Sequence, residues 1–319
     1  MRHQVSRRSF LAALPLVPAW GAGAKPMRGI FVIMATPFTE SGAVDYEDLE
    51  REVDFMVRCQ VHGMVWPQLA SEYASLNQQE RMRGMEVLAK AARGKAPALV
   101  LGVQGANVAA ALEYLKKAED LGPDALIAIP PTEAKSVDDF RRYYEALGGA
   151  TKRPLFIQTT GGAKGITPAV EMIAGLARQF PHLGYVKEEA EPVVERMLAL
   201  SKERPVVRSL FSGAAGKGML YEWRLGMDGT MPGAPFSDVY VRIWDAWQAG
   251  EKEKAREIFS KLLLMINLDT VIPGTRQYMM KRRGVFKTMV SRRSKFALSA
   301  KAVEEIEFCY AGLEAYRKF

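Results

Sequence analysis

Lys187 is the residue of this sequence whose type and position best fit covalent chemistry. It follows the short apolar run 183–186, which is typical of a buried strand, and so it closes that strand. A lysine amine attacks a carbonyl carbon when it is neutral, and apolar surroundings favour the neutral form. The position therefore indicates Schiff-base chemistry. The alternative is a structural lysine that reaches solvent or pairs with Glu188, Glu189 or Glu191.

Proton transfer at such a site needs further groups. Side chains alternate between the two faces of a strand, so Tyr185 shares a face with Lys187, about 6–7 Å away along the strand. Glu133, which follows another predicted strand, is the second titratable candidate. For both residues the alternative is structural, as a core tyrosine and a surface glutamate. Gln158, which closes a third strand, is a strand-end candidate that can form hydrogen bonds but does not titrate.

The elements that position these residues are short apolar strands that alternate with amphipathic helices, which is the pattern of repeated βα units around a parallel sheet. Strands are predicted over residues 29–35, 63–68, 98–104, 125–130, 155–159, 184–187, 206–211 and 229–232. They number eight, as a closed barrel requires. Apolar residues recur at three- and four-residue spacing in 46–59, 78–92, 108–121 and 168–180, which predicts helices there. An open doubly wound sheet is disfavoured because no G-x-G-x-x-G follows the first strand.

Four more helices are predicted after the eighth strand, over 238–249, 252–269, 275–286 and 301–316. The first completes the outer ring and the others form an extension. The sequence therefore predicts an α/β protein, with a (β/α)8 TIM barrel over residues 25–250 and a C-terminal helical extension over 251–319. In such barrels the active site lies at the carboxyl ends of the strands. The candidates are then Thr36, residues 68–72, Gln104, and residues 130–133, 158–160, 187, 212–213 and 232–233.

Residues 1–24 have the order of an export signal. Arg7 and Arg8 precede an apolar run, 12–20, and the small residues 21–24, and paired arginines at this place are typical of a twin-arginine signal. The apolar run is too short to span a bilayer. We expect a periplasmic or otherwise exported protein that begins near Lys25 and has no stable membrane insertion. The alternative is a chance basic extension.

Composition excludes several classes of partner. Two cysteines and three widely separated histidines give no metal-ligand spacing, so no metal is predicted, and no cofactor motif is found. The formal net charge is +8, and a basic cluster lies near the C-terminus at Lys281, Arg282, Arg283, Lys287, Arg292, Arg293 and Lys295. Without a nucleic-acid-binding motif, such a cluster is expected to be a solvated face, and no nucleic-acid partner is predicted.

Over residues 27–260 the chain resembles the family of dihydrodipicolinate synthase and N-acetylneuraminate lyase, which are class I aldolase-type barrels. The similarity lies in the order and spacing of short segments: Thr36-Pro37-Phe38, Ser71-Glu72 with Leu76 and Glu80-Arg81, Gly102-Val103 with Gly105-Ala106-Asn107, Pro130-Pro131, Val186-Lys187-Glu188, and Ser212-Gly213. The resemblance implies that Lys187 is the Schiff-base lysine that binds the keto carbon of pyruvate or a related 2-keto acid. It also implies a homo-oligomer, either a dimer or a tetramer.

The chain departs from the family where the substrate is held. The family's Gly-Thr-Thr-Gly-Glu segment, which binds the keto acid's carboxylate, reads Gln-Leu-Ala-Ser-Glu over 68–72, so Ala70, Ser71 and backbone amides remain as the expected carboxylate site. The catalytic tyrosine of the fifth strand corresponds to Gln158, which we interpret as a hydrogen-bond donor that orients the substrate. The relay tyrosine after the fourth strand is replaced by Thr132 and Glu133.

The substrate-recognising arginine of the loop after the fifth strand falls on Ala163, with Lys164 beside it. We therefore expect a protein other than a true dihydrodipicolinate synthase. Glu133, Thr160, Lys164 and Gly213 complete the expected substrate-binding set.

Two functions of different classes fit these residues. The first is an exported Schiff-base lyase, of the aldolase or dehydratase type, that acts on a 2-keto acid or a sugar-acid derivative. The second is a non-catalytic periplasmic protein that binds or senses a keto acid, which the loss of the tyrosine relay favours. Cleavage of N-acetylneuraminate ranks below both, because that reaction also relies on the tyrosine that Gln158 replaces.

Overall fold

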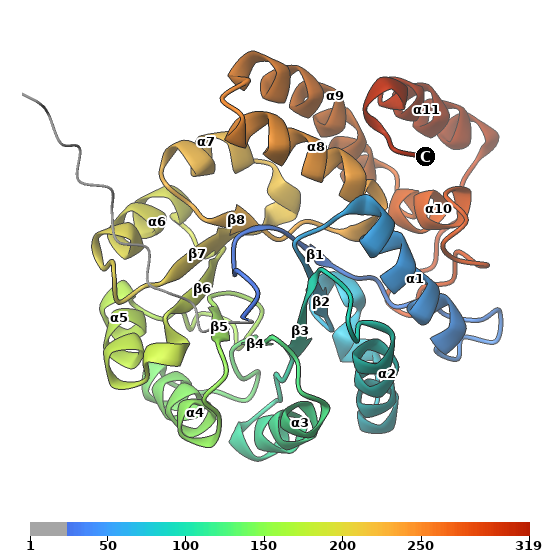
Figure 1. Ribbon diagram of the computed structural model, residues 1–319. Coiled ribbons are helices and arrows are strands. Elements are labelled where there is room, and N and C mark those ends of the chain that lie inside the picture. The colour runs from blue at the N-terminus through green and yellow to red at the C-terminus, as the bar shows by residue number, and fades with distance from the viewer. Residues whose placement is uncertain (1–23) are drawn as a thin grey trace, which may run out of the picture.

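A computed structural model describes residues 24–319, and it confirms the predicted barrel (Figure 1). The predicted export signal lies outside the described residues except for Ala24. Eight parallel strands pair in chain order, and β8 closes the barrel by pairing with β1. Their bounds are β1 Gly29–Ile33, β2 Gly63–Trp66, β3 Ala98–Gly102, β4 Ala125–Ala128, β5 Leu155–Gln158, β6 Tyr185–Glu188, β7 Ser209–Ser212 and β8 Gly229–Thr230.

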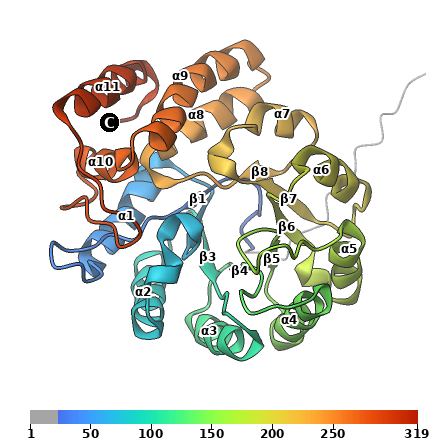
Figure 2. The ribbon, with the colours of Figure 1, turned by 180° about the vertical axis from the view of Figure 1, so that it is seen from behind.

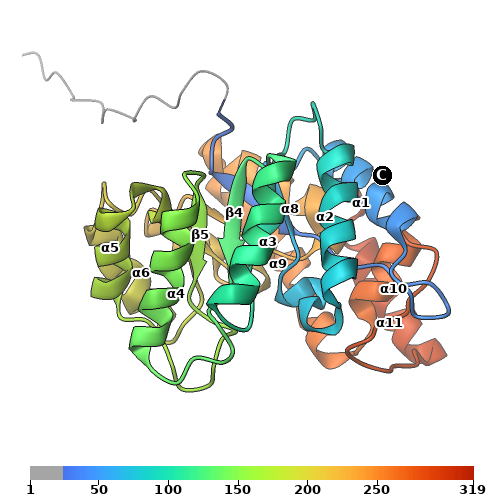
Figure 3. The ribbon, with the colours of Figure 1, turned by 90° about the horizontal axis from the view of Figure 1, so that it is seen from below.

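The outer ring consists of α1 Tyr46–Cys59, α2 Gln78–Ala91, α3 Val108–Leu121, α4 Val137–Ala150, α5 Val170–Gln179, α6 Val193–Lys202, α7 Met219–Arg224 and α8 Ser237–Gln248. Figure 3 shows helices of this ring standing alongside the strands that they cover. Local chemistry sets their ends. Asn77 and Glu80 exchange side-chain and backbone hydrogen bonds in a capping box at the start of α2. Gly122 ends α3 in the left-handed conformation, with φ 68°.

The barrel interior is filled in layers, which set the depth of the site. Phe31, Phe156, Tyr185 and Phe211 form an aromatic layer, with ring centroids 5.0–5.5 Å apart between Phe31 and Phe211, Phe156 and Phe211, and Phe156 and Tyr185. Phe156 is in register with Tyr185, and two residues further Gln158 is in register with Lys187. The layer that contains the lysine therefore lies above the aromatic floor, toward the carboxyl ends of the strands.

The C-terminal extension consists of α9 Lys252–Val271, α10 Thr275–Arg282 and α11 Ala300–Ala311, and it packs beside α8 (Figure 2). The predicted helix over 275–286 is too long. The observed helix α10 ends at Arg282 because Gly284 takes a left-handed conformation, with φ 68°, and redirects the chain so that Val285 and Phe286 are buried. Within residues 24–319, none of the helices has the length and apolarity to cross a membrane.

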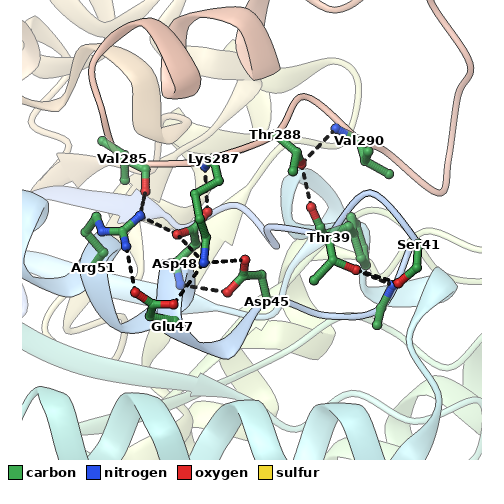
Figure 4. A network of polar contacts seen from close by, with 12 residues as sticks. Thr39, Ser41, Asp45, Glu47, Asp48, Arg51, Val285, Lys287, Thr288 and Val290 are labelled. Atoms are coloured by element: carbon green, nitrogen blue, oxygen red, sulfur yellow. Dashed lines mark hydrogen bonds and ion pairs between the residues drawn. The ribbon is translucent and has the colours of Figure 1, made fainter.

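The basic cluster of the extension is only partly a solvated face, which corrects the expectation from the sequence. The Nζ of Lys287 lies 3.0 Å from the Asp45 carboxylate and 2.9 Å from that of Glu47 (Figure 4). The guanidinium of Arg292 binds both carboxylate oxygens of Glu80, at 2.8 and 2.6 Å. These contacts fasten the segment after α10 to the regions that follow β1 and β2, at the carboxyl end of the barrel.

Candidate active site

Lys187 lies inside the barrel near the carboxyl end of β6, with 2% of its surface exposed. Its neighbours in the sheet are Gln158, the last residue of β5, and Phe211 of β7. The alternation along β6 turns Val186 into the cluster between strands and helices, and keeps Tyr185 in the barrel interior. The lysine is thus held by the rigid scaffold at the end of the barrel where active sites of this architecture lie.

The surroundings of the Lys187 amine are more polar than the apolar setting expected from the sequence. Its Nζ lies 3.0 Å from Oε2 of Glu189 and 3.3 Å from Oε1 of Gln158. Glu189 has 16% of its side chain exposed, so the ion pair is largely withdrawn from water. In the sequence Glu189 was considered only as a structural partner of the lysine. Its spacing of two residues from Lys187 is the signal that places both on one face.

Glu189 is held in place by donors from two other loops. The backbone N–H of Ala214 donates to Oε1 at 2.8 Å, and Oγ1 of Thr160 donates to Oε2 at 3.3 Å. Burial by itself raises the pKa of the Glu189 carboxyl, but the positive charge of Lys187 and these hydrogen bonds outweigh it, so that the pKa lies below its ordinary value. Glu189 is therefore an ionised carboxylate at neutral pH.

Gly213 leaves the space that Glu189 occupies. A Cβ atom built on Gly213 would lie 1.9 Å from Oε1 of Glu189. Gly213 therefore acts through Glu189, because its lack of a side chain lets Glu189 approach the loop after β7. The sequence had placed Gly213 itself among the substrate-binding residues.

Replacing Gly213 with alanine should displace Glu189 and lower the free energy of unfolding by about 1–3 kcal/mol, the usual cost of overpacking. Urea unfolding measures this. Gly175→Ala in α5 is the matched control, because nothing lies within 4 Å of its added Cβ, and it should stabilise the protein by about 0.5–1 kcal/mol. A Gly213→Ala variant as stable as the wild type would contradict the tight fit.

Gln158 is oriented by a second hydrogen bond. Its Nε2 donates to the backbone carbonyl of Thr160 at 3.2 Å, which turns Oε1 toward Lys187. The amide therefore accepts a hydrogen bond from the amine in this state, whereas the sequence suggested a donor to substrate. Gln158, Thr160, Lys187 and Glu189 form one connected polar group, which we call the lysine cluster.

Contacts on the outer face of β6 also hold the lysine cluster in place. Glu188 is fully buried, accepts a hydrogen bond from Oγ1 of Thr159 at 2.6 Å and pairs with Arg196 at 3.1 Å. The same Thr159 hydroxyl accepts the backbone N–H of Glu189 at 3.0 Å. The chain that carries Glu189 is thereby tied to β5. In the sequence Thr159 lies among the strand-end candidates 158–160, whereas nothing in it pointed to Arg196.

The structure does not bring Tyr185, Glu133 or Lys164 to the Lys187 amine. The Tyr185 hydroxyl interacts with Arg208, which immediately precedes β7 at the opposite end of the barrel, and burial raises the pKa of Tyr185. Glu133 is exposed and accepts a hydrogen bond from Asn107 at 2.8 Å. Lys164 is exposed in the loop after β5. The proton-transfer roles considered for Tyr185 and Glu133 therefore lack support from the geometry.

In the loop after β2, the two side chains of the expected carboxylate site, Ala70 and Ser71, have different surroundings. The Ser71 hydroxyl donates to the Met34 carbonyl and accepts the Gln68 N–H at 3.0 Å, so it holds the turn Leu69–Ser71 instead of facing a ligand. Ala70 packs against the apolar cluster of the barrel interior. The Ser71 side chain therefore does not face a ligand, contrary to the expectation that it binds a carboxylate.

Residues 24–319 contain no group of three or more His, Cys, Asp or Glu side chains suited to hold a metal ion.

Known proteins share both the sequence pattern and the barrel. A model of the dihydrodipicolinate synthetase family matches residues 26–308. The chain is 28% identical over 249 residues to a 4-hydroxy-tetrahydrodipicolinate synthase of Parabacteroides distasonis, covering 76% of this chain and 83% of that protein. It is 24% identical over 268 residues to an L-2-keto-3-deoxyarabonate dehydratase of Azospirillum brasilense, covering 81% and 85%.

Solved structures are similar in fold. A dihydrodipicolinate synthase from Rhodopseudomonas palustris superposes with a TM-score of 0.79 at 22% identity, covering 90% of this chain and 97% of that one. One from Thermotoga maritima gives a TM-score of 0.79 at 20% identity, covering 89% and 97%. Because the family model spans most of the sequence and the closed barrel has the same architecture, this chain belongs to the dihydrodipicolinate synthetase family.

Proposed function

We propose that this protein is a Schiff-base-forming lyase, of the aldolase or dehydratase type, that acts on a 2-keto acid or a sugar-acid derivative through Lys187. The observation that carries the proposal is the position of Lys187, which is buried near the carboxyl end of β6 in a barrel of this family. An amine there condenses with a keto carbon to form an iminium ion. The iminium then draws electrons from the neighbouring C–C or C–H bond.

We propose that the substrate of this protein differs from that of a true dihydrodipicolinate synthase. Gln158 stands where the family has its catalytic tyrosine, Ala163 stands in place of the arginine, and Leu69 and Ala70 replace the two threonines. The relatives support a broader lyase chemistry, since they include an L-2-keto-3-deoxyarabonate dehydratase and an uncharacterised DapA-like lyase of Thermococcus kodakarensis, 25% identical over 88% of this chain and 97% of that protein.

A panel of 2-keto acids and 2-keto-3-deoxy sugar acids, followed by proton NMR, tests this proposal. We expect at least one compound to be consumed, with release of pyruvate or loss of water. The second candidate function, a non-catalytic keto-acid binding or sensory protein, is favoured by the absence of a tyrosine at Gln158. It predicts that keto acids raise the melting temperature of both the wild type and Lys187→Ala while none is consumed.

We also propose that the protein is exported and forms a homo-oligomer. Arg7 and Arg8 before an apolar run support a twin-arginine signal over residues 1–24, and membership of the family supports the oligomer. Fractionation of cells that express the full chain should find it in the periplasm, and the double change Arg7→Lys and Arg8→Lys should retain it in the cytoplasm. Light scattering of the purified protein should give the mass of a dimer or a tetramer.

A further inference from the structure

We infer that Glu189 is the proton-transfer residue of this site and does the work that the missing tyrosine does in the family. The inference rests on the proposed function, because it assigns a role within the Schiff-base reaction of Lys187. Its basis is geometric: a carboxylate oxygen lies 3.0 Å from the reacting nitrogen, inside the barrel. That distance is within the reach required of a general base.

The lysine cluster offers one titratable partner to Lys187. Gln158 and Glu189 both contact its Nζ, and of the two only Glu189 can take up and return a proton. Tyr185 and Glu133, the other titratable candidates from the sequence, have their polar groups at Arg208 and Asn107. The chain thus has a non-titrating amide where the family has its tyrosine, and a carboxylate two residues beyond the lysine.

The structure holds the Glu189 carboxylate in a defined orientation. Oε1 receives the Ala214 N–H, and Oε2 faces both Lys187 and Thr160. Gly213 leaves room for Oε1, which a side chain at that position would displace. A base that is held by fixed donors requires little rearrangement during the reaction.

The proposed steps are balanced in protons. The Glu189 carboxylate takes a proton from the Lys187 ammonium, and the neutral amine attacks the keto carbon. A proton passes from nitrogen to the former carbonyl oxygen, giving a neutral carbinolamine. Glu189 then returns its proton to the carbinolamine hydroxyl, which leaves as water while the C=N bond of the iminium forms. The regenerated carboxylate removes a proton from C3, and the C–H electron pair forms the enamine.

Two titratable groups influence Glu189 from neighbouring elements. Lys187 of β6 favours the ionised carboxylate, which lowers the pKa of Glu189. Glu222 of α7 has a raised pKa, first because it is buried and also because of the negative charge of Glu189. A rate that needs ionised Glu189 should therefore fall as the pH drops below the ordinary pKa of a glutamate carboxyl.

Solvent exchange of the C3 protons of pyruvate isolates the step assigned to Glu189. The protein is incubated with pyruvate in D2O, proton NMR follows loss of the methyl signal, and borohydride trapping in parallel measures Schiff-base formation by intact mass. The wild type should do both. Glu189→Gln should form the adduct more slowly, because no carboxyl group protonates the departing hydroxyl, and exchange should fall by at least about 100-fold. Glu191→Gln, an exposed glutamate in the same loop, is the matched control and should exchange at the wild-type rate.

The outcomes separate this inference from the proposed function. Wild-type exchange in a Glu189→Gln variant that forms the adduct would overturn the role of Glu189 and leave the Schiff base intact. A wild type that forms no adduct with any keto acid would overturn both. If Glu189→Gln does not fold, Glu189→Asp and the pH profile of the wild type decide. We expect Glu189→Asp to exchange at an intermediate rate, and the exchange rate of the wild type to fall at acidic pH. A Glu189→Asp variant that exchanges at the wild-type rate, together with a wild-type profile that does not fall at acidic pH, would refute the inference.

Discussion

Replacing Lys187 with alanine or arginine should reduce turnover of the substrate by about 10⁴-fold or more, because the amine is the covalent nucleophile of the proposed reaction. Lys187→Arg is the more informative variant. A guanidinium keeps the positive charge beside Glu189, which lies 3.0 Å from Nζ in the wild type, but it does not condense with a keto carbon. Steady-state rates measure the loss.

A comparison of Lys187→Ala with Lys187→Arg separates the loss of chemistry from the loss of stability. Lys187→Ala leaves the Glu189 carboxylate without its charged partner in a largely buried place, so its lower activity reflects both chemistry and stability. Lys187→Arg should melt closer to the wild-type temperature and be equally inactive. A Lys187→Arg variant that retains turnover within tenfold of the wild type would show that the lysine is not the nucleophile.

Asp238→Ala should lower the free energy of unfolding by about 3–5 kcal/mol, because it leaves a buried guanidinium unpaired. Arg283, which follows α10, binds both carboxylate oxygens of Asp238 in α8, at 2.8 and 2.7 Å. Their side chains are 2% and 0% exposed. The pair thus joins the C-terminal extension to the outer ring of the barrel. Urea unfolding monitored by circular dichroism measures the change.

An exposed ion pair provides the comparison. Glu251 and Lys254 are 2.6 Å apart, with about half of each side chain in contact with solvent. Glu251→Ala should therefore change the free energy of unfolding by less than about 1 kcal/mol. If Asp238→Ala were as mild as Glu251→Ala, the buried pair would have no role in docking the extension.

The sequence predicted the barrel well because its strands are buried on both faces and read as short apolar runs. The ends of the strands were less predictable, since they depend on tertiary contacts. Strand β1 begins at Gly29 as predicted but ends at Ile33 instead of residue 35. The reason is that the N–H of Ala35 donates to the carboxyl group of Glu52 in α1, which takes the backbone out of the ladder.

The position of the central lysine of the candidate site was predictable from the sequence, and the contacts around it were less so. Lys187 was found from its place at a strand end, and Gln158 from the resemblance to the family. The contacts of Glu189 were not predictable, because they depend on a neighbouring loop, where Gly213 makes room for it and Ala214 binds it. The Ser71 hydroxyl was misassigned, because its acceptor, the Met34 carbonyl, lies 37 positions earlier in the chain.

Tyr185 illustrates the limit of periodicity. The alternation along β6 correctly placed it on the face of Lys187, in the barrel interior. Periodicity does not show where a long side chain ends. The Tyr185 ring packs against Phe156 at 5.4 Å, and its hydroxyl interacts with Arg208, which immediately precedes β7.

Borohydride trapping followed by peptide mapping tests the central claim most directly. The full-length protein is incubated with a panel of 2-keto acids, reduced, digested and analysed by mass spectrometry. The proposed function predicts one keto-acid adduct per chain, located on Lys187 and absent from Lys187→Arg. No adduct with any member of the panel, or adducts spread over exposed lysines such as Lys164 with Lys187 unmodified, would contradict it.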